Sequence, residues 1–458
     1  MMHLRSTSLV AGALLAASAA GAQQATVKER PLGATIYKSK DLLGAVSAVR
    51  GLPDGKLLVN DISGRKVVLF DANLENFSII ADTTSATANA YSSRAGGLIP
   101  WKSDSTLFVD PNSLSMLVID GKGKIARVMS VPRANEAGFL VGGPNGTPGT
   151  DAQGRLVFRG MQDMRMMMTR MGGIANGGPG GSSATPDSAP LLRMDLAARK
   201  LDTIGALQIA KQNVSVTRDD NGRVSVNITV NPMPVVDDWA ILADGSIAVL
   251  RGKDYHIDWT RPDGSKGSTP KISFDWKRMT DDDKIAFIDS SRVAMEKLRS
   301  AALSGNPGAV QAGANAVMGG GGTQMRFQMS GGEAMPPQRG GGDGRGGPPP
   351  ADVRGGGPGG VGNVNVPPIN MVSPSELPDY APPFTAGSAR GDLDGNLWVR
   401  TSKVVNGGSM YDVINTKGEL IDRILVPAGR VIAGFGKDVV YMGVREGTGV
   451  RLEVAKIK

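Results

Sequence analysis

One short pattern of apolar and polar positions recurs along the chain. It opens with a turn, often Asp-Gly, and continues with apolar residues at alternating or successive positions, as in Asp54–Val59. Asp and Gly tolerate the positive φ of tight turns, so each copy predicts a strand entered through a tight turn. Six copies occur, and they cover Asp54–Val59, Asp104–Val109, Asp151–Phe158, Asp244–Val249, Asp394–Val399 and Phe435–Tyr441.

A second apolar strand follows each copy, and several copies continue into a third. Lys66–Phe70 and Ser115–Ile119 are clear second strands, and Lys124–Met129 is a third. Repeated hairpin units of about 40 residues are typical of a β-propeller, in which each small sheet packs against its neighbours. We therefore predict an all-β fold, a six-bladed β-propeller. The segment from Thr26 to Lys40 is expected to supply a strand missing from the last unit and so to close the ring.

These repeats resemble exported bacterial six-bladed β-propeller proteins of the NHL-repeat-like group. The resemblance is carried by the recurring strands, by the hairpin from Tyr255 to Gly264, and by Pro382–Phe384 with the strand after Asp394. It covers nearly the whole chain apart from the insertions. It implies the propeller architecture and no particular activity, because a fold does not by itself define a function.

The first 22 residues have the pattern of a secretory signal peptide. Arg5 precedes an apolar run from Ser8 to Gly21, and Ala20–Ala22 forms a small-x-small cleavage site. The run is too short for an ordinary transmembrane helix, and no Cys follows it to accept a lipid. We expect a soluble exported protein, periplasmic or extracellular and without a lipid anchor, whose propeller spans residues 23–458.

Four insertions interrupt the repeats. Residues 160–190 are rich in Met and Gly, and residues 213–230 alternate with period two around an Asn-Gly turn, which predicts an extra hairpin. Residues 279–304 contain a predicted helix, with Thr280 as its N-cap and acidic residues in its first turn. Residues 305–370 are predicted to be a disordered loop, because 28 of the 58 residues from 305 to 362 are Gly or Pro.

Composition narrows the possible chemistry. The chain has no Cys, which excludes disulfides, thiol catalysis and Cys-ligated metal centres. It has two His, and one of them, His3, lies in the signal peptide, so His256 is the single His of the mature chain. The net charge of +8 is modest for 458 residues and is dispersed, so it does not predict nucleic-acid binding.

The axial channel of the propeller is the predicted site. If the repeated strands are the innermost ones, their ends project polar groups into a common cavity. Arginine favours carboxylate or phosphate ligands through its planar fork, although these side chains could instead pair with one another or face solvent. His256 could contribute, oriented by Asp258 two positions further along the strand. The candidate residues are Asp61, Asp110, Arg159, Arg251, His256 and Arg400.

No cofactor is predicted, and the sequence offers two candidate metal sites. Thioether sulfur binds soft metals, so the Met-rich insertion is a candidate loop for such an ion, or else a flexible apolar segment. Asp392 begins a sequence similar to a calcium loop, but it coincides with the turn shared by the other repeats, which favours a plain turn. Ca²⁺ remains a candidate ligand. The methionines are Met161, Met164, Met166, Met167, Met168 and Met171.

Two functions follow from these observations. The first is an exported binding or scaffold module for a protein, peptide or small anionic ligand, monomeric and without catalytic activity. The alternative is a propeller enzyme that uses the axial channel, such as a metal-dependent lactonase-like hydrolase. The glutamate that lactonase-like families carry before the first inner strand is absent from Leu43–Arg50, and Asn60, Asp61 and Asp110 could replace it only in part.

Overall fold

The structure is a computed structural model that describes residues 27–83, 91–92, 95–102, 104–161, 181–211, 213–218, 224–303 and 370–458. The predicted signal peptide lies outside these residues. So do all candidate methionines except Met161, and the Gly/Pro-rich segment up to residue 369.

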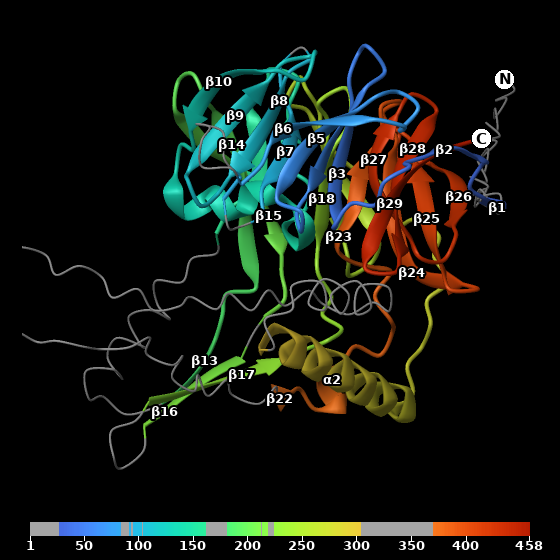
Figure 1. The fold of residues 1–458 in the computed structure, drawn as a ribbon. Coiled ribbons are helices and arrows are strands. Elements are labelled where there is room, and N and C mark those ends of the chain that lie inside the picture. Colours follow the sequence, from blue (N-terminus) through green and yellow to red (C-terminus); the bar gives the residue numbers. More distant parts are fainter. Residues whose placement is uncertain are drawn as a thin grey trace, which may run out of the picture.

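Six sheets form the blades of a β-propeller, as the repeats predicted, and each is built around an antiparallel meander (Figure 1). Blades 1 to 3 come from the N-terminal half of the chain. Their strands are β3 (Val46–Gly51), β4 (Leu57–Asp61), β5 (Lys66–Phe70) and β6 (Phe77–Ala81); β7 (Gly97–Pro100), β8 (Thr106–Asp110), β9 (Ser115–Ile119) and β10 (Ile125–Ser130); and β11 (Gly149–Thr150), β12 (Leu156–Arg159), β14 (Ser188–Asp195) and β15 (Lys200–Gln208).

Blades 4 to 6 complete the ring. Their strands are β18 (Asp238–Ile241), β19 (Ile247–Arg251), β20 (His256–Thr260) and β21 (Lys266–Ser268); β23 (Phe384–Gly391), β24 (Leu397–Val405), β25 (Gly408–Ile414) and β26 (Leu420–Val426); and β27 (Arg430–Gly436), β28 (Val439–Glu446) and β29 (Gly449–Lys456).

The N-terminal segment closes the ring, as predicted. Strand β2 (Thr35–Lys38) pairs antiparallel with β29 and completes blade 6, and β1 (Glu29–Pro31) pairs parallel with β26 at the outer edge of blade 5. Both termini of the propeller therefore lie at the same side of the molecule (Figure 1). Arg30 fastens this segment, since its Nε and Nη2 donate to Asp422 Oδ2 at 2.9 and 2.6 Å.

The innermost strands are the first strands of the blades. Neighbouring first strands contact one another, most extensively β18 with β23 and β27 with β3, and also β3 with β7 and β7 with β11. The repeated strands that follow the Asp-Gly turns are second strands, so their predicted innermost position is wrong. They carry the clearest apolar pattern because blades cover both of their faces: every residue of β4 and of β8 is buried.

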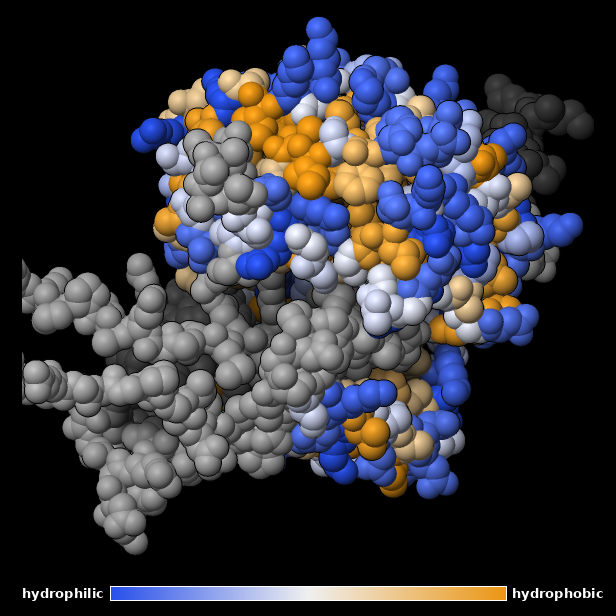
Figure 2. Space-filling view, in the orientation of Figure 1, coloured by the Kyte–Doolittle hydropathy of each residue, from blue (hydrophilic) through white to orange (hydrophobic). Residues whose placement is uncertain are grey.

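Apolar side chains pack between neighbouring blades rather than within one of them. Trp398 and Tyr411 of blade 5 meet Phe435 of blade 6, with the Trp398 and Phe435 ring centroids 5.1 Å apart. Tyr255 and Phe384 join blades 4 and 5 in the same way. On the surface shown in Figure 2, apolar and polar side chains are mixed over both the propeller and the elements below it.

Three insertions form a second body, here called the cap, beside one face of the ring (Figure 1). They follow β12, β15 and β21. Strands β13 (Gly181–Ala184), β16 (Asn213–Arg218), β17 (Val224–Val230) and β22 (Asn370–Met371) form its sheet, and α2 (Asp281–Leu303) and the 3₁₀ turn η3 (Pro374–Glu376) lie beside them. The predicted hairpin is the antiparallel pair β16–β17. No helix of the described residues is long and apolar enough to cross a membrane.

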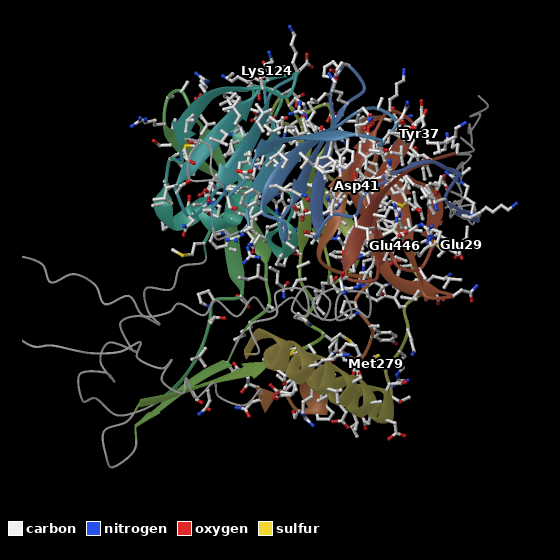
Figure 3. All side chains as sticks on the ribbon, viewed as in Figure 1. Glu29, Tyr37, Asp41, Lys124, Met279 and Glu446 are labelled. Atoms are coloured by element: carbon white, nitrogen blue, oxygen red, sulfur yellow. The ribbon has the colours of Figure 1, made fainter. Side chains whose placement is uncertain are left out.

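The cap has its own apolar core. The predicted helix begins as expected, because Thr280 Oγ1 accepts the backbone N–H of Asp283 at 3.1 Å. Lys284 is buried on the inner side of α2, and its Nζ donates to Asp379 Oδ1 at 2.8 Å. Met279, labelled in Figure 3, belongs to the core, whereas Lys124 marks a turn at the opposite face of the propeller. The buried core residues are Met233, Met279, Ile288, Val372 and Leu377.

Candidate functional site

The predicted site residues lie toward the face of the propeller that carries the cap, because the second strands run in that direction. The structure does not gather all six into one group. It divides them into three neighbourhoods, around Tyr91, around Asp258 and around Asp238.

The first neighbourhood contains Asp61, whose carboxylate accepts hydrogen bonds from backbone N–H groups. It is fully buried, and its Oδ1 accepts the N–H groups of Ala45 and Gly64 at 2.9 and 2.8 Å. Its Oδ2 accepts the N–H of Gly44 at 3.0 Å. Lys66 Nζ lies 4.0 Å from the same oxygen. The hydrogen bonds from these three backbone N–H groups compensate for the burial of the carboxylate charge.

Asp110 and Asn60 lie near the same tyrosine and are similarly engaged. Asp110 Oδ1 accepts the hydroxyl of Ser92 at 2.5 Å, and its Oδ2 accepts that of Ser113 at 2.8 Å. Asn60 accepts the Tyr91 hydroxyl at 2.9 Å, and its Nδ2 donates to Ser47 Oγ and to the Gly96 carbonyl. Burial is the main reason that the pKa of Tyr91 rises to about 12, and the charges of Asp61 and Asp110 also raise it.

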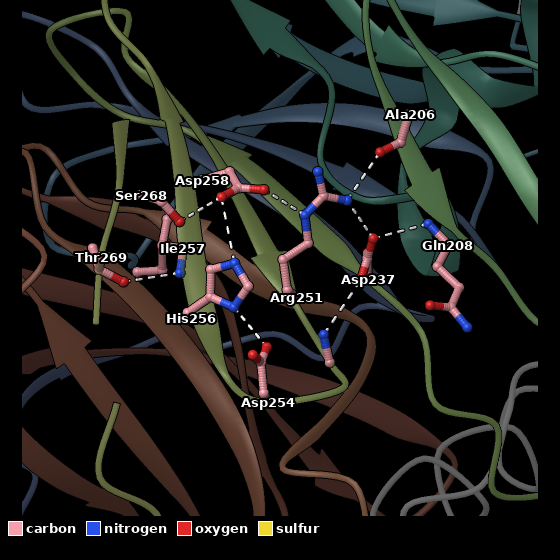
Figure 4. Close-up of polar contacts among 11 residues, drawn as sticks. Ala206, Gln208, Asp237, Arg251, Asp254, His256, Ile257, Asp258, Ser268 and Thr269 are labelled. Atoms are coloured by element: carbon pink, nitrogen blue, oxygen red, sulfur yellow. Dashed lines mark hydrogen bonds and ion pairs between the residues drawn. The ribbon is translucent and has the colours of Figure 1, made fainter. Parts of the chain in front are cut away.

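The second neighbourhood is a chain of ion pairs in blade 4 (Figure 4). Arg251 ends β19, and it donates from Nε to Asp258 Oδ2 at 2.7 Å and from Nη1 to Asp237 Oδ2 at 2.6 Å. Burial opposes the charge of Arg251, but these hydrogen bonds raise its pKa above the usual value. His256 lies between two acids, with Nδ1 2.6 Å from Asp254 Oδ1 and Nε2 3.4 Å from Asp258 Oδ1.

In this network Arg251 and His256 are both paired with carboxylates. The predicted partnership of His256 with Asp258 is present, and Ser268 Oγ adds a hydrogen bond to Asp258 Oδ1 at 2.7 Å. Because two carboxylates balance Arg251, the network has little unpaired positive charge for a ligand.

The third neighbourhood surrounds Asp238, the first residue of innermost strand β18. Asp238 is buried, and its Oδ2 accepts the N–H groups of Ser388 and Ala389 of β23 at 2.6 and 2.8 Å. Burial raises the pKa of Asp238 to about 6, against the effect of these backbone hydrogen bonds. Asp238 therefore joins the innermost strands of blades 4 and 5 at the axis.

Arg159 and Arg390 lie near enough to this carboxylate for its charge to act on them, and Arg400 lies near Arg390; the three are here called the arginine group. Burial lowers the pKa of Arg159, with Asp238 acting in the opposite direction. Burial also lowers the pKa of Arg390, and the like charge of Arg400 adds to that effect, while Tyr411 and Asp238 oppose it. In the part of the chain that the structure describes, no hydrogen bond or ion pair joins Arg390 or Arg400 to another side chain, and the buried Nε of Arg159 has no partner. All three arginines keep some exposed surface.

The sequence pattern pointed to Arg159 and Arg400 but missed Arg390. Arg390 lies on β23, a first strand, and its short stretch before the Asp394-Gly395 turn has no apolar alternation that marks it. An innermost strand precedes each repeated strand. The position of Arg390 could therefore have been found one strand before the Asp394-Gly395 turn.

A chain segment crosses the axis next to the arginine group. It runs from 134 to 146, here called the crossing segment, and contains the 3₁₀ turns η1 (Ala134–Val141) and η2 (Gly143–Asn145). A Cβ on Gly97 of β7 would collide with the Leu140 carbonyl, and one on Gly387 of β23 would lie 2.7 Å from the Gly143 carbonyl. Blades 2 and 5 face each other in a ring of six, so a segment that touches both spans the axis.

The two remaining metal candidates are the Met-rich insertion and the turn at Asp392. Met161 is 44% exposed, and the other five methionines lie outside the described residues. Asp392 forms the predicted turn: its Oδ1 accepts the N–H groups of Asp394 and Asn396, and its Oδ2 accepts Trp398 Nε1 at 2.9 Å. The described residues contain no group of three or more His, Cys, Asp or Glu side chains placed to hold a metal ion.

No protein-family model matches the chain, and no curated protein matches it. Solved structures of propeller proteins are similar to it in fold. A Bacteroides fragilis protein named as exported is 9% identical, with a TM-score of 0.40 over 94% of this chain and 98% of that one. A Xanthomonas campestris gluconolactonase is 10% identical, with a TM-score of 0.35 over 93% and 99%. A calcium-binding regucalcin from Agrobacterium tumefaciens is 10% identical, with a TM-score of 0.31 over 94% and 96%.

These values describe a partial likeness in overall shape. The six-bladed architecture rests on the strand pairing of this chain, and the roles of its residues rest on their contacts.

Proposed function

We propose that the propeller binds a small anionic ligand, with a carboxylate or phosphate group, through Arg159, Arg390 and Arg400. The observation that carries this proposal is the charge imbalance around Asp238. Among the described residues, Arg159 and Arg390 lie near Asp238 and Arg400 lies near Arg390, and Asp238 already accepts backbone hydrogen bonds.

An anion would relieve the cost of this arrangement. Burying a charged guanidinium group is unfavourable, and burial is the main reason that the pKa values of Arg159 and Arg390 are lowered; for Arg390 the like charge of Arg400 adds to the effect. Guanidinium groups offer paired N–H donors that match the oxygens of a carboxylate or phosphate. Clusters of perturbed ionisable groups occur preferentially at functional sites, which also supports the proposal.

The proposal is tested by thermal unfolding in the presence of inorganic phosphate or succinate. A ligand at one hundred times its dissociation constant stabilises the folded state by about 2.7 kcal/mol, which raises the midpoint by a few degrees in a domain of this size. We expect such a shift for the wild type and its loss in Arg390→Gln and Arg400→Gln. Arg193→Gln is the matched control, since Arg193 is a partly exposed arginine of blade 3 that pairs with Asp202. An equal shift in all variants would refute the site.

The alternative is a metal-dependent lactonase-like hydrolase. Several similar structures bear the names of lactonases or of a calcium-binding protein, which agrees with this alternative better than with a binding module, although the likeness is one of fold alone. In this chain the hydrogen bonds of Asp61, Asp110 and Asn60 occupy the oxygens that would bind the metal. Calcium-dependent stabilisation, together with hydrolysis of a panel of sugar lactones, would favour the enzyme; neither effect is expected from the arginine group.

We further propose that the protein is exported as a monomer after removal of residues 1–22. The pattern of the first 22 residues supports export. N-terminal sequencing of the protein from the cell envelope or medium, with light scattering for its mass, tests both statements. An N-terminus at Met1 would refute cleavage.

A further inference from the structure

The outer edges of the six blades differ in how they are protected. An outermost strand presents backbone N–H and C=O groups on its free side, and proteins commonly protect such an edge with charged side chains or proline. The outermost strands β1, β2, β10, β15 and β21 each contain at least one charged residue. Strand β6 of blade 1 contains neither a charged residue nor proline, and no strand of the described residues pairs with its outer side.

Beside β6 lies the margin of the apolar cluster between blades 1 and 2. Leu69 and Ile80 of blade 1 and Ile125 of blade 2 are partly buried and pack against this cluster. Val128 of β10 is 51% exposed and lies directly opposite Leu117, a member of the same cluster. Directly opposite residues of an antiparallel pair point to the same face, so Val128 also faces blade 1. The residues Leu69, Ile80, Ile125 and Val128 are here called the rim surface.

The chain itself shows how an extended segment adds to a blade edge. Strand β1, three residues long, pairs with β26 at the edge of blade 5, and Arg30 donates to Asp422 across this pair. Strand β2 pairs with β29 in blade 6, and Lys38 Nζ lies 3.0 Å from Glu453 Oε1. In both places a charged side chain of the added strand meets an opposite charge of the blade.

Strand β6 offers no such charge to an added strand. It pairs regularly with β5 from Phe77 to Ile79, a stretch as long as β1, and a bulge at Ile80 follows. Lys66 of β5 lies over the Phe77 ring, with Nζ 5.2 Å from the ring centre and 4.0 Å from Asp61 Oδ2. A charged residue on a strand added here would leave water without an opposite charge on β6, so an uncharged strand is favoured.

We propose that the free edge of β6 binds an extended, uncharged segment of a partner protein by strand addition. The backbone of Phe77–Ile79 supplies the hydrogen bonds, and every second side chain of the added segment lies against the rim surface. The fitting segment is one in which apolar β-branched residues alternate with small polar ones. This inference does not depend on the arginine group.

The test uses the mature chain and a dye-labelled, capped nine-residue peptide in which Thr and Val alternate, with binding measured by fluorescence anisotropy. One control peptide has Pro in place of two central Val residues and so lacks two N–H donors. A second control peptide has Glu and Lys in place of two central Thr residues. We expect the Thr/Val peptide to bind with an affinity that does not change with salt, and both control peptides to bind at least tenfold more weakly.

Variants of the chain locate the binding. Ile79→Lys places a charge on the edge, and Val128→Lys places one on the rim surface. We expect each to weaken binding of the Thr/Val peptide about fivefold, the effect of losing a cross-strand apolar contact. Ile421→Lys is the matched control, because Ile421 is 49% exposed and Ile79 is 52% exposed, but β1 covers the outer side of the strand that carries Ile421. Thermal unfolding without peptide shows that each variant is folded.

Several outcomes would overturn the proposal. Absence of binding, equal binding of the proline peptide, or equal binding by Ile79→Lys would show that no strand adds to β6. Equal binding of the charged peptide would overturn the preference for an uncharged segment. Light scattering tests the other occupant: a wild-type dimer that is absent from Ile79→Lys would show that a second copy of the chain covers this edge, in place of a partner protein.

Discussion

Carboxylates that look alike in the sequence have different roles at the residue scale. Asp61 and Asp110 end equivalent second strands, and both hold local turns and loops through backbone or hydroxyl donors. Asp238 lies one strand further in and joins two blades. The difference is one of position, because only an innermost strand brings a side chain next to the strands of the neighbouring blade.

The raised pKa of Asp238 makes stability depend on pH. Its folded pKa of about 6 lies above the unfolded value of about 3.9, so the folded state holds the proton more tightly. The stabilising contribution is complete below about pH 4 and is lost as pH rises through about 6.

Asp238→Asn tests this directly. The variant keeps an oxygen that can accept the Ser388 and Ala389 N–H groups, but it cannot ionise. We expect its unfolding free energy, relative to the wild type, to rise by up to about 3 kcal/mol between pH 4 and pH 7. Urea unfolding at several pH values measures the difference. A relative free energy that does not change with pH would contradict the raised pKa.

Phe139 is expected to support anion binding through Arg159. A cation–π contact contributes about 0.5–1 kcal/mol at a partly exposed site. Phe139→Ala should therefore weaken phosphate binding about two- to fivefold, whereas Phe139→Tyr, which keeps the ring, should bind nearly as well as the wild type. Equal weakening in both variants would show that the ring face is not what matters.

At the scale of elements, the crossing segment shows how a loop can occupy the centre of a propeller. It has little regular structure, and three of its glycines, Gly142, Gly143 and Gly146, have positive φ. Such a backbone can turn tightly enough to lie between the innermost strands. No apolar period in this stretch predicts that position, since its contacts come from blades 2, 3, 4 and 5.

Glu136 is a buried acidic residue of the crossing segment whose hydrogen bonding is incomplete. It is 6% exposed, its Oε2 has no hydrogen-bond partner, and Arg133 Nε lies 3.8 Å away. Burial raises its pKa, so its contribution to stability is lost as pH rises through the folded pKa. Glu136→Gln should be more stable than the wild type at pH 7 and lose this advantage at low pH, as measured by urea unfolding. A variant that is less stable at pH 7 would point to an ionised role for Glu136.

At the scale of the whole molecule, the N-terminal segment joins blades 5 and 6. Strands β1 and β2 come from the start of the chain, and they cover edges of β26 and β29 that would otherwise present unpaired backbone groups. The cap has an equally long-range origin, because β17 and β22 pair although residues 231–369 separate them in sequence.

Deletion of residues 27–38 tests the closure. The truncated chain, still preceded by a signal peptide, should unfold at a clearly lower temperature and tend to associate through the exposed edges. A synthetic peptide covering 27–40 should restore the midpoint, and a peptide of the same composition in scrambled order should not. A truncated chain with the wild-type midpoint would show that the ring closes without these strands.

Local patterns in the sequence were sufficient for the repeating strands, the turns, the helix α2 and the number of blades. Turn chemistry and apolar alternation act between residues close in the chain, so each repeat can be recognised by itself. Closure by the N-terminal segment could also be predicted, because a blade with too few strands must find another.

The tertiary structure decided what no local pattern contains. It assigned the innermost position to the short first strands, assembled the cap from three insertions, and placed the crossing segment over the axis. It also brought Arg159 of blade 3 and Arg390 of blade 5 near Asp238 of blade 4. These relations depend on the angle between blades and on the closing of the ring, which arise only when residues far apart in the sequence pack together.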